Sequence, residues 1–172
     1  EDGIRDHCVT GVQTCALPIC VIDGATNAKI VNDISVGTNP YAVAVNSVTN
    51  RIYVANSYWN GSSVSVIDGT SNVVVATVAV GANPYAVAVN SVTNRIYVAN
   101  YSGNSVSVID GASNVVVATV AVGSSPQGVA VNSVTNRIYV ANWGSTSVSV
   151  IDGNTNATLA TVAVGTNLVG VD

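Results

Sequence analysis

The sequence is short of charged side chains. Only 8% of its 172 residues are charged, and five of them are Lys or Arg, whereas an average domain is about 25% charged. A surface that binds nucleic acid needs clustered cations, so the composition excludes that class of partner. The chain has one His, which leaves little for acid–base or metal chemistry.

Long hydrophobic runs are missing as well. Uninterrupted apolar stretches such as residues 73–76 fall far short of the roughly 20 residues that a membrane-spanning helix needs. We therefore expect no membrane insertion. What the chain does have is a composition that is 48% hydrophobic, with Ser, Thr and Asn in the place of charges on its surface.

Residues 1–19 show neither strand alternation nor a helical stripe, and they lack the basic start and apolar core of a secretory signal. Residues 1–6 and 9–19 resemble the two ends of a translated DNA adapter from short-read sequencing libraries, with His7 and Cys8 at the place of the index. We therefore interpret residues 1–20 as a non-native N-terminus and its junction. On this interpretation a native signal peptide would not be visible.

This resemblance also removes several reactive side chains from the native protein. His7, Cys8 and Cys15 would otherwise be the candidates for a metal site or a thiol pair. Beyond Cys20 the chain contains no His, Glu or Cys. We therefore predict no catalytic residue, no metal site and no cofactor.

From residue 21 onward the chain is an internal repeat. The triplet Ile-Asp-Gly begins at residues 22, 67, 109 and 151, so that the spacing is 45, 42 and 42 residues. Each period holds four short Val-, Ile- or Tyr-rich segments separated by turn residues, which in the middle copy are 85–90, 95–100, 105–110 and 115–122. Such segments predict strands.

Four strands in 40–45 residues are typical of a β-propeller blade. A β-sandwich does not require repeats so similar, and a leucine-rich solenoid has a shorter period. The block Asn-Arg-Ile-Tyr-Val-Ala-Asn at 50–56, 94–100 and 136–142, followed by Val-Ser-Val-Ile-Asp, resembles the YVTN-type β-propeller repeat. Ala55, Ala99 and Ala141 stand where the family has Thr, which is a conservative change on a strand.

We thus predict an all-β fold over residues 21–172, with about 3.6 four-stranded antiparallel blades forming an open arc or a fragment of a larger ring. Complete blades are expected at 41–80, 85–122 and 127–164, with a partial blade at 21–36 and the start of another at 168–172. Open blade faces expose valines, so we expect copies of the chain to self-associate.

Each blade contains one Arg and one Asp at fixed places, namely Arg51 with Asp68, Arg95 with Asp110, and Arg137 with Asp152. The hairpin register puts each Arg opposite its Asp, which predicts repeated structural ion pairs. Because each Asp-Gly turn contains a single carboxylate, turn formation explains these segments better than calcium binding.

The loops vary where the strands do not, which is typical of binding loops on a repeated scaffold. The loops after the second strand and before the first strand emerge on one face. They form a predicted aromatic rim whose members are Tyr41, Tyr58, Trp59, Tyr85, Tyr101, Gln127 and Trp143. Such side chains suit interfaces and carbohydrate surfaces, although they would also shield the tops of the blades.

The interpretation that we favour is a non-enzymatic binding or scaffold module that recognises a protein or carbohydrate through this rim. The YVTN-type resemblance implies a secreted protein or one displayed on a prokaryotic cell surface. The alternative is a fragment of a lactonase- or hydrolase-like propeller enzyme whose active site lies in missing blades.

Overall fold

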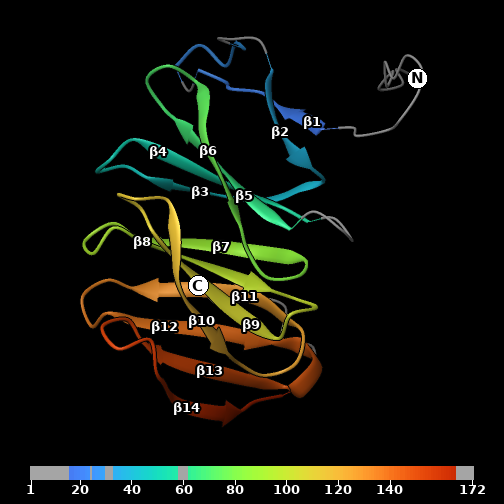
Figure 1. Ribbon diagram of the computed structural model, residues 1–172, viewed down its shortest axis with the longest axis vertical. Helices are drawn as coiled ribbons and strands as arrows, with labels where there is room; N and C mark the ends of the chain where they lie inside the picture. Colours follow the sequence, from blue (N-terminus) through green and yellow to red (C-terminus); the bar gives the residue numbers. More distant parts are fainter. Residues whose placement is uncertain (1–15, 24, 30–32, 58–61, 166–172) are drawn as a thin grey trace.

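The computed structural model describes residues 16–23, 25–29, 33–57 and 62–165. The regular structure of these residues is almost entirely β-strand, with one 3-10 turn, η1 (Trp143–Ser145). No helix within these ranges is long and apolar enough to cross a membrane. Three four-stranded antiparallel sheets follow one another along the molecule, from blue-green to red in Figure 1.

The strands of each complete sheet are neighbours in chain order. The first blade contains β3 (Pro40–Asn46), β4 (Arg51–Asn56), β5 (Ser63–Asp68) and β6 (Val73–Ala79). The second contains β7 (Pro84–Asn90), β8 (Arg95–Asn100), β9 (Ser105–Asp110) and β10 (Val115–Ala121). The third contains β11 (Pro126–Asn132), β12 (Arg137–Asn142), β13 (Ser147–Asp152) and β14 (Thr158–Ala163).

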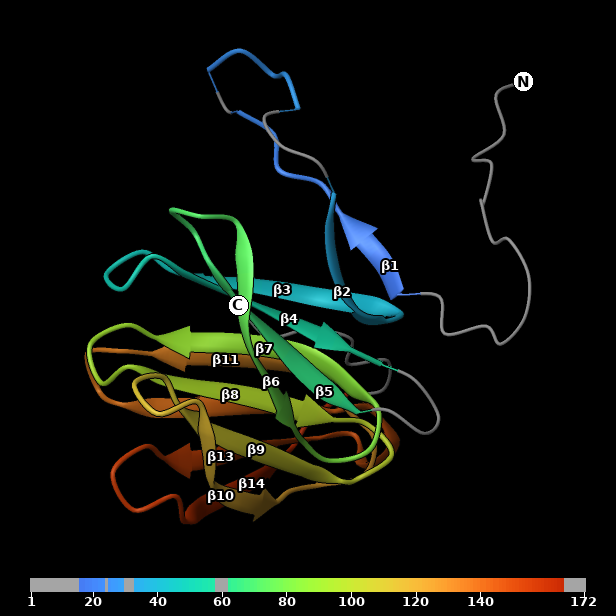
Figure 2. The same ribbon diagram turned by 45° about the horizontal axis from the view of Figure 1, so that its top comes forward.

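The blades are arranged as an open arc. Their first strands, β3, β7 and β11, lie close to one another, whereas the outer strands β6 and β10 make far less contact (Figure 2). Sheets that converge on their first strands and diverge at their last strands have the radial arrangement of a propeller. The predicted fold class, a partial β-propeller of four-stranded antiparallel blades, is confirmed.

Local sequence explains where the strands begin and end. Each first strand begins at a proline, which can stand at the start of a strand because it lacks a ladder N–H. In the turn between β7 and β8, the Asn90 side chain accepts hydrogen bonds from the N–H groups of Val92 and Thr93 at 3.1 and 3.3 Å. Asn94 closes this turn with a φ of 50°, a left-handed conformation that Asn tolerates better than most residues.

The hydrophobic core lies between blades rather than within one. Tyr53 and Val64 of the first blade are buried in one cluster with Ile96 of the second. Tyr97 and Val106 of the second blade are buried in the next cluster with side chains of the third. Each four-stranded sheet therefore buries both of its faces only where another blade covers it.

The partial blade differs from the sequence-based expectation. We expected residues 1–19 to contribute no strand, but β1 (Ala16–Ile19) pairs antiparallel with β2 (Ile34–Thr38). Ile19 faces Ile34 in this pair and packs against the core cluster that contains Ile34 and Val54. The bonds of an antiparallel ladder are made by backbone groups, so a segment without side-chain alternation can form a strand. Residues 1–15 and 168–172 lie outside the described residues.

Candidate binding site at the loop rim

Two sets of loops meet at one end of the blades. The loop before each first strand contains a residue in the left-handed conformation: Asn39, Asn83 and Ser125, with φ of 49°, 53° and 52°. The carbonyls of Asn39 and Asn83 accept hydrogen bonds from the N–H groups of Ser57 and Tyr101, at 2.8 and 2.7 Å. These bonds hold the loop after each second strand against the loop before the first strand.

Three tyrosines gather where these loops meet. The ring centroids of Tyr41 and Tyr85, which are the second residues of the first strands of neighbouring blades, are 4.2 Å apart. The centroids of Tyr85 and Tyr101 are 4.8 Å apart, and these two rings are stacked. The structure therefore unites three members of the predicted rim, which we call the tyrosine cluster.

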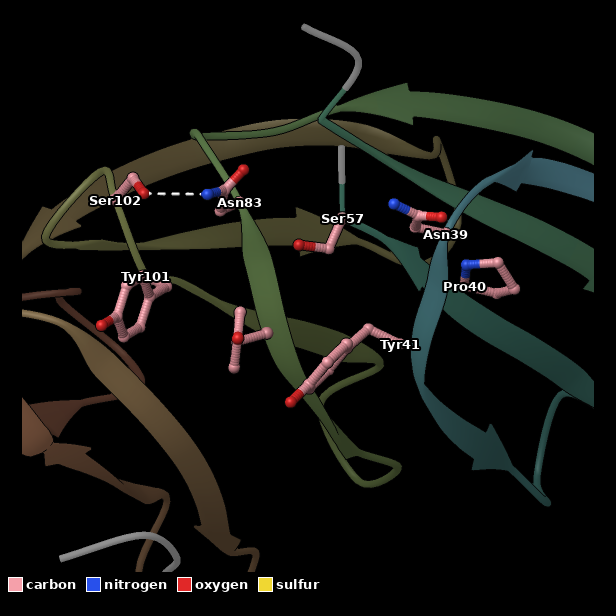
Figure 3. A pocket seen from close by; sticks show the side chains of 8 residues that line it. Asn39, Pro40, Tyr41, Ser57, Asn83, Tyr101 and Ser102 are labelled. Carbon is pink, nitrogen blue, oxygen red and sulfur yellow. Dashed lines mark hydrogen bonds between the residues drawn. The ribbon is translucent and has the colours of Figure 1, made fainter. Parts of the chain in front are cut away.

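The tyrosine cluster borders a cavity of about 600 Å³ (Figure 3). Tyr41 and Tyr101 lie on two sides of it in Figure 3. The other lining residues are Asn39, Pro40, Ser57, Asn83, Tyr85 and Ser102. The Asn83 amide donates a hydrogen bond of 2.9 Å to the Ser102 hydroxyl, which fixes two polar groups at the edge of the cavity.

The cavity is polar without being charged, since its lining consists of Tyr, Asn, Ser and Pro. The pKa of the Tyr85 phenol is raised above its ordinary value, first by the hydrogen-bonding hydroxyl of Tyr41 and then by burial. The phenol therefore stays neutral at physiological pH. Aromatic faces beside neutral amides and hydroxyls can stack on a ligand and exchange hydrogen bonds with it.

The structure does not unite the whole predicted rim at this cavity. Gln127 and Trp143 belong to the third blade and are not among the residues that line it. Tyr58 and Trp59 lie outside the described residues. Sequence reasoning had not selected the polar side chains of Asn39, Ser57, Asn83 and Ser102, although they flank the aromatic positions.

The ion pairs lie at the other end of the strands. Arg95 is opposite Asp110 in the ladder between β8 and β9, and their charged atoms are 2.6 Å apart. Arg51 pairs with Asp68, and Arg137 with Asp152, in the same register. Because the three pairs are equivalent and lie one per blade, they support the hairpins rather than form one site.

Each of these aspartates also organises a turn. Asp110 Oδ1 accepts hydrogen bonds from the N–H groups of Ala112 and Ser113, at 3.0 and 2.8 Å. The pKa values of Asp68, Asp110 and Asp152 are lowered, and the largest cause is a backbone N–H of the turn. Among the described residues, no three His, Cys, Asp or Glu side chains lie close enough to share a metal ion.

Similar structures share the fold. Hydrazine synthase of Kuenenia stuttgartiensis is 26% identical with a TM-score of 0.67, over 72% of this chain and 35% of its own. A functionally unknown protein from Desulfotomaculum acetoxidans DSM 771 is 14% identical with a TM-score of 0.68, over 79% and 46%. U3-55K is 14% identical with a TM-score of 0.65, over 73% and 39%. The chain thus spans less than half the length of each of these structures.

A search of curated proteins finds no match. Residues 19–122, more than half of the chain, match the family described as "Lactonase, 7-bladed beta-propeller". The matched range ends with the second complete blade, and the third blade repeats its sequence and its register. The chain therefore belongs to the seven-bladed, lactonase-type β-propeller family.

Proposed function

We propose that this chain is a non-enzymatic binding module, of the YVTN type within its family, that recognises a neutral carbohydrate in the cavity of the tyrosine cluster. The observation that carries the proposal is the joining of three tyrosine rings from two blades beside an uncharged polar lining. Following the YVTN-type resemblance, we assign the module to the outside of a prokaryotic cell.

The chemistry of the cavity favours a sugar. A pyranose ring has an apolar face of C–H groups, which stacks on phenol rings, and hydroxyls at its edge, which pair with amides and hydroxyls. Tyr41 is 58% exposed, so that its ring can be covered by a ligand. The volume of about 600 Å³ suits a ligand of drug-like or disaccharide size.

The test is a calorimetric titration with neutral oligosaccharides of glucose, mannose and N-acetylglucosamine. We expect the unmodified chain to bind. For Tyr41→Ala and for Tyr101→Ala we expect Kd to rise about tenfold or more, as for aromatic hot spots. Trp143→Ala is the matched control, because Trp143 follows the second strand of its blade as Tyr101 does, yet does not line the cavity.

The outcomes separate the hypotheses. Binding that is unchanged in Tyr41→Ala and Tyr101→Ala would refute the cavity as the site. Equal losses in all three variants would extend the site to the rim of the third blade. No heat with any of the three sugar series would refute a neutral carbohydrate ligand.

A second candidate follows from the family, since its name denotes lactone hydrolysis. Ring opening of a lactone needs an acid–base group or a metal-activated water. Residues 21–172 contain no His, Glu or Cys, and the carboxylates of Asp68, Asp110 and Asp152 are engaged in ion pairs and turns. Hydrolysis of glucono-δ-lactone by the chain above the spontaneous rate would support this candidate and contradict the non-enzymatic proposal.

A further inference from the structure

Irregularities in two strands bring two rings of the tyrosine cluster together. The ladder between β3 and β4 shifts its register at Tyr41, and the ladder between β7 and β8 shifts its register at Tyr85. Each tyrosine is thus the extra residue of a β-bulge. A bulge residue is left out of the regular ladder, which allows its side chain to take a new direction. Both rings therefore meet at the boundary between the first and second blades.

The contact between these two rings is closer than ordinary aromatic packing. Their centroids are 4.2 Å apart, with an angle of 37° between the ring planes, whereas aromatic pairs usually have centroids about 4.5–7 Å apart. The hydrogen-bonding hydroxyl of Tyr41 is also the first cause of the raised pKa of the Tyr85 phenol. The hydroxyl ends of the two rings therefore lie together, and so do the ring carbons next to them.

The same two rings are open to small molecules. Both line the cavity of the tyrosine cluster, where Tyr41 is exposed and Tyr85 is half-buried. By contrast, Tyr53 and Tyr97 are fully buried between blades. An oxidant in solution therefore reaches the pair at the cavity far more readily than it reaches the tyrosines of the core.

We propose that Tyr41 and Tyr85 form a modification site, at which a one-electron oxidant such as a peroxidase with hydrogen peroxide joins the first two blades by a dityrosine bond. Each phenol loses one electron and one proton and becomes a phenoxyl radical, whose unpaired electron is shared with the carbons next to the hydroxyl. The two radicals combine by a bond between these carbons, and the hydrogens on the two carbons return to the phenol oxygens. The two electrons and two protons that are released reduce one hydrogen peroxide to two waters.

The bond would be specific to one blade boundary. In the third blade the register shift falls on Gln127, so the boundary between the second and third blades lacks the second phenol. Tyr101 is the competing partner, because its ring is stacked on Tyr85 with the centroids 4.8 Å apart. We choose Tyr41 because its ring is closer to Tyr85 and because its hydroxyl meets that of Tyr85.

Such a bond would also stabilise the arc. Tyr41 and Tyr85 are 44 residues apart in the sequence, and the first two blades are held together by side-chain packing. A covalent link between distant residues restricts the unfolded chain more than the folded one, as in the chain-entropy account of disulfides. We therefore expect the cross-linked chain to unfold at a higher urea concentration.

The test treats the full chain with a haem peroxidase and hydrogen peroxide. A protein concentration of about 1 μM disfavours links between copies, and the thiols are alkylated first because Cys20 is free and exposed. Trypsin cuts after Lys and Arg, which places the three members of the tyrosine cluster in three different peptides, 30–51, 52–95 and 96–137. Mass spectrometry then identifies which two peptides are joined.

We expect a product of monomer size that has dityrosine fluorescence, is lighter by two hydrogen atoms, and has peptides 30–51 and 52–95 joined. Tyr41→Phe and Tyr85→Phe keep the rings but remove the hydroxyls from which the radicals form, so both variants should lose this product. Tyr101→Phe is the matched control and should retain it. The oxidised unmodified chain should have a higher urea midpoint than oxidised Tyr41→Phe.

Several results would overturn the proposal. One is an unmodified chain in which peptides 30–51 and 52–95 are not joined within one copy. Another is the same product in Tyr85→Phe, which would assign the bond to a different tyrosine of peptide 52–95. Loss of the product in Tyr101→Phe, or a link between peptides 52–95 and 96–137 in its place, would show that Tyr101 is the partner. No carbohydrate takes part, so these outcomes are independent of the proposed binding function.

Discussion

The repeat allows the contribution of a neighbouring blade to stability to be measured by one substitution made in three places. Val78, Val120 and Val162 occupy the same position in the identical segment Ala-Thr-Val-Ala-Val. The strand propensity of this segment is the same in each copy. Only the exposure differs, at 5%, 7% and 50%, because the third copy has no blade beyond it among the described residues.

The expected magnitudes follow from burial. A Val→Ala change removes two carbon groups, which at about 0.8 kcal/mol each amounts to about 1.6 kcal/mol when the side chain is fully buried. A residual cavity adds roughly 0.5–1 kcal/mol. We therefore expect Val78→Ala and Val120→Ala to lower the free energy of unfolding by about 2–2.5 kcal/mol, and Val162→Ala by about 0.8 kcal/mol or less.

The assay is urea unfolding followed by circular dichroism, with the m-value compared between variants. A protein concentration of about 1 μM keeps weak self-association from burying Val162. Equal losses at all three positions would refute the reasoning, because they would show that the strand itself, and not the covering blade, determines the cost.

Two further predictions concern the turns. Because the pKa values of Asp68, Asp110 and Asp152 are lowered in the folded chain, their stabilising effect is complete above the unfolded pKa of about 4 and is lost as the pH falls through the folded value. The urea midpoint should therefore stay constant from about pH 7 to pH 5 and fall below about pH 4. The fall should be less steep for Asp110→Asn, and an equally steep fall in that variant would contradict the stabilising role of the Asp110 carboxylate. Gly111→Ala would place its Cβ 2.3 Å from Asn94 Oδ1, which accepts the hydrogen bond of the Asn46 amide from the neighbouring blade. We therefore expect the free energy of unfolding in urea to fall by about 1–3 kcal/mol. Gly165→Ala, with nothing within 4 Å of its Cβ, is the control, and equal stability of both variants would count against this role of the turn.

Much of each blade was predictable from local patterns. The second and third strands begin and end at the expected residues, for example Arg95–Asn100 and Ser105–Asp110. Alternating apolar residues and Asn or Asp turns act within a few residues of each other. The register of the hairpin then placed Arg95 opposite Asp110 without knowledge of anything outside the blade.

The candidate site was predictable only in part. The aromatic positions were visible as variation in otherwise constant loops, but the distances among Tyr41, Tyr85 and Tyr101 depend on how two blades pack. How the blades pack also leaves Gln127 and Trp143 outside the lining of the cavity. Position within a repeat therefore indicates which loop a residue occupies, and not which residues of other loops it meets.

The sequence alone was sufficient for the repeat, the four strands of each blade, their turns and the cross-strand ion pairs, because these features arise between neighbouring segments of the chain. The relation between blades needed the tertiary structure. Asn46 meets Asn94, 48 residues away, and Tyr139 differs from its identical counterparts Tyr53 and Tyr97 only in lacking a cover. Identical residues acquire different environments because burial depends on what packs against a surface, and that is a property of the folded arc.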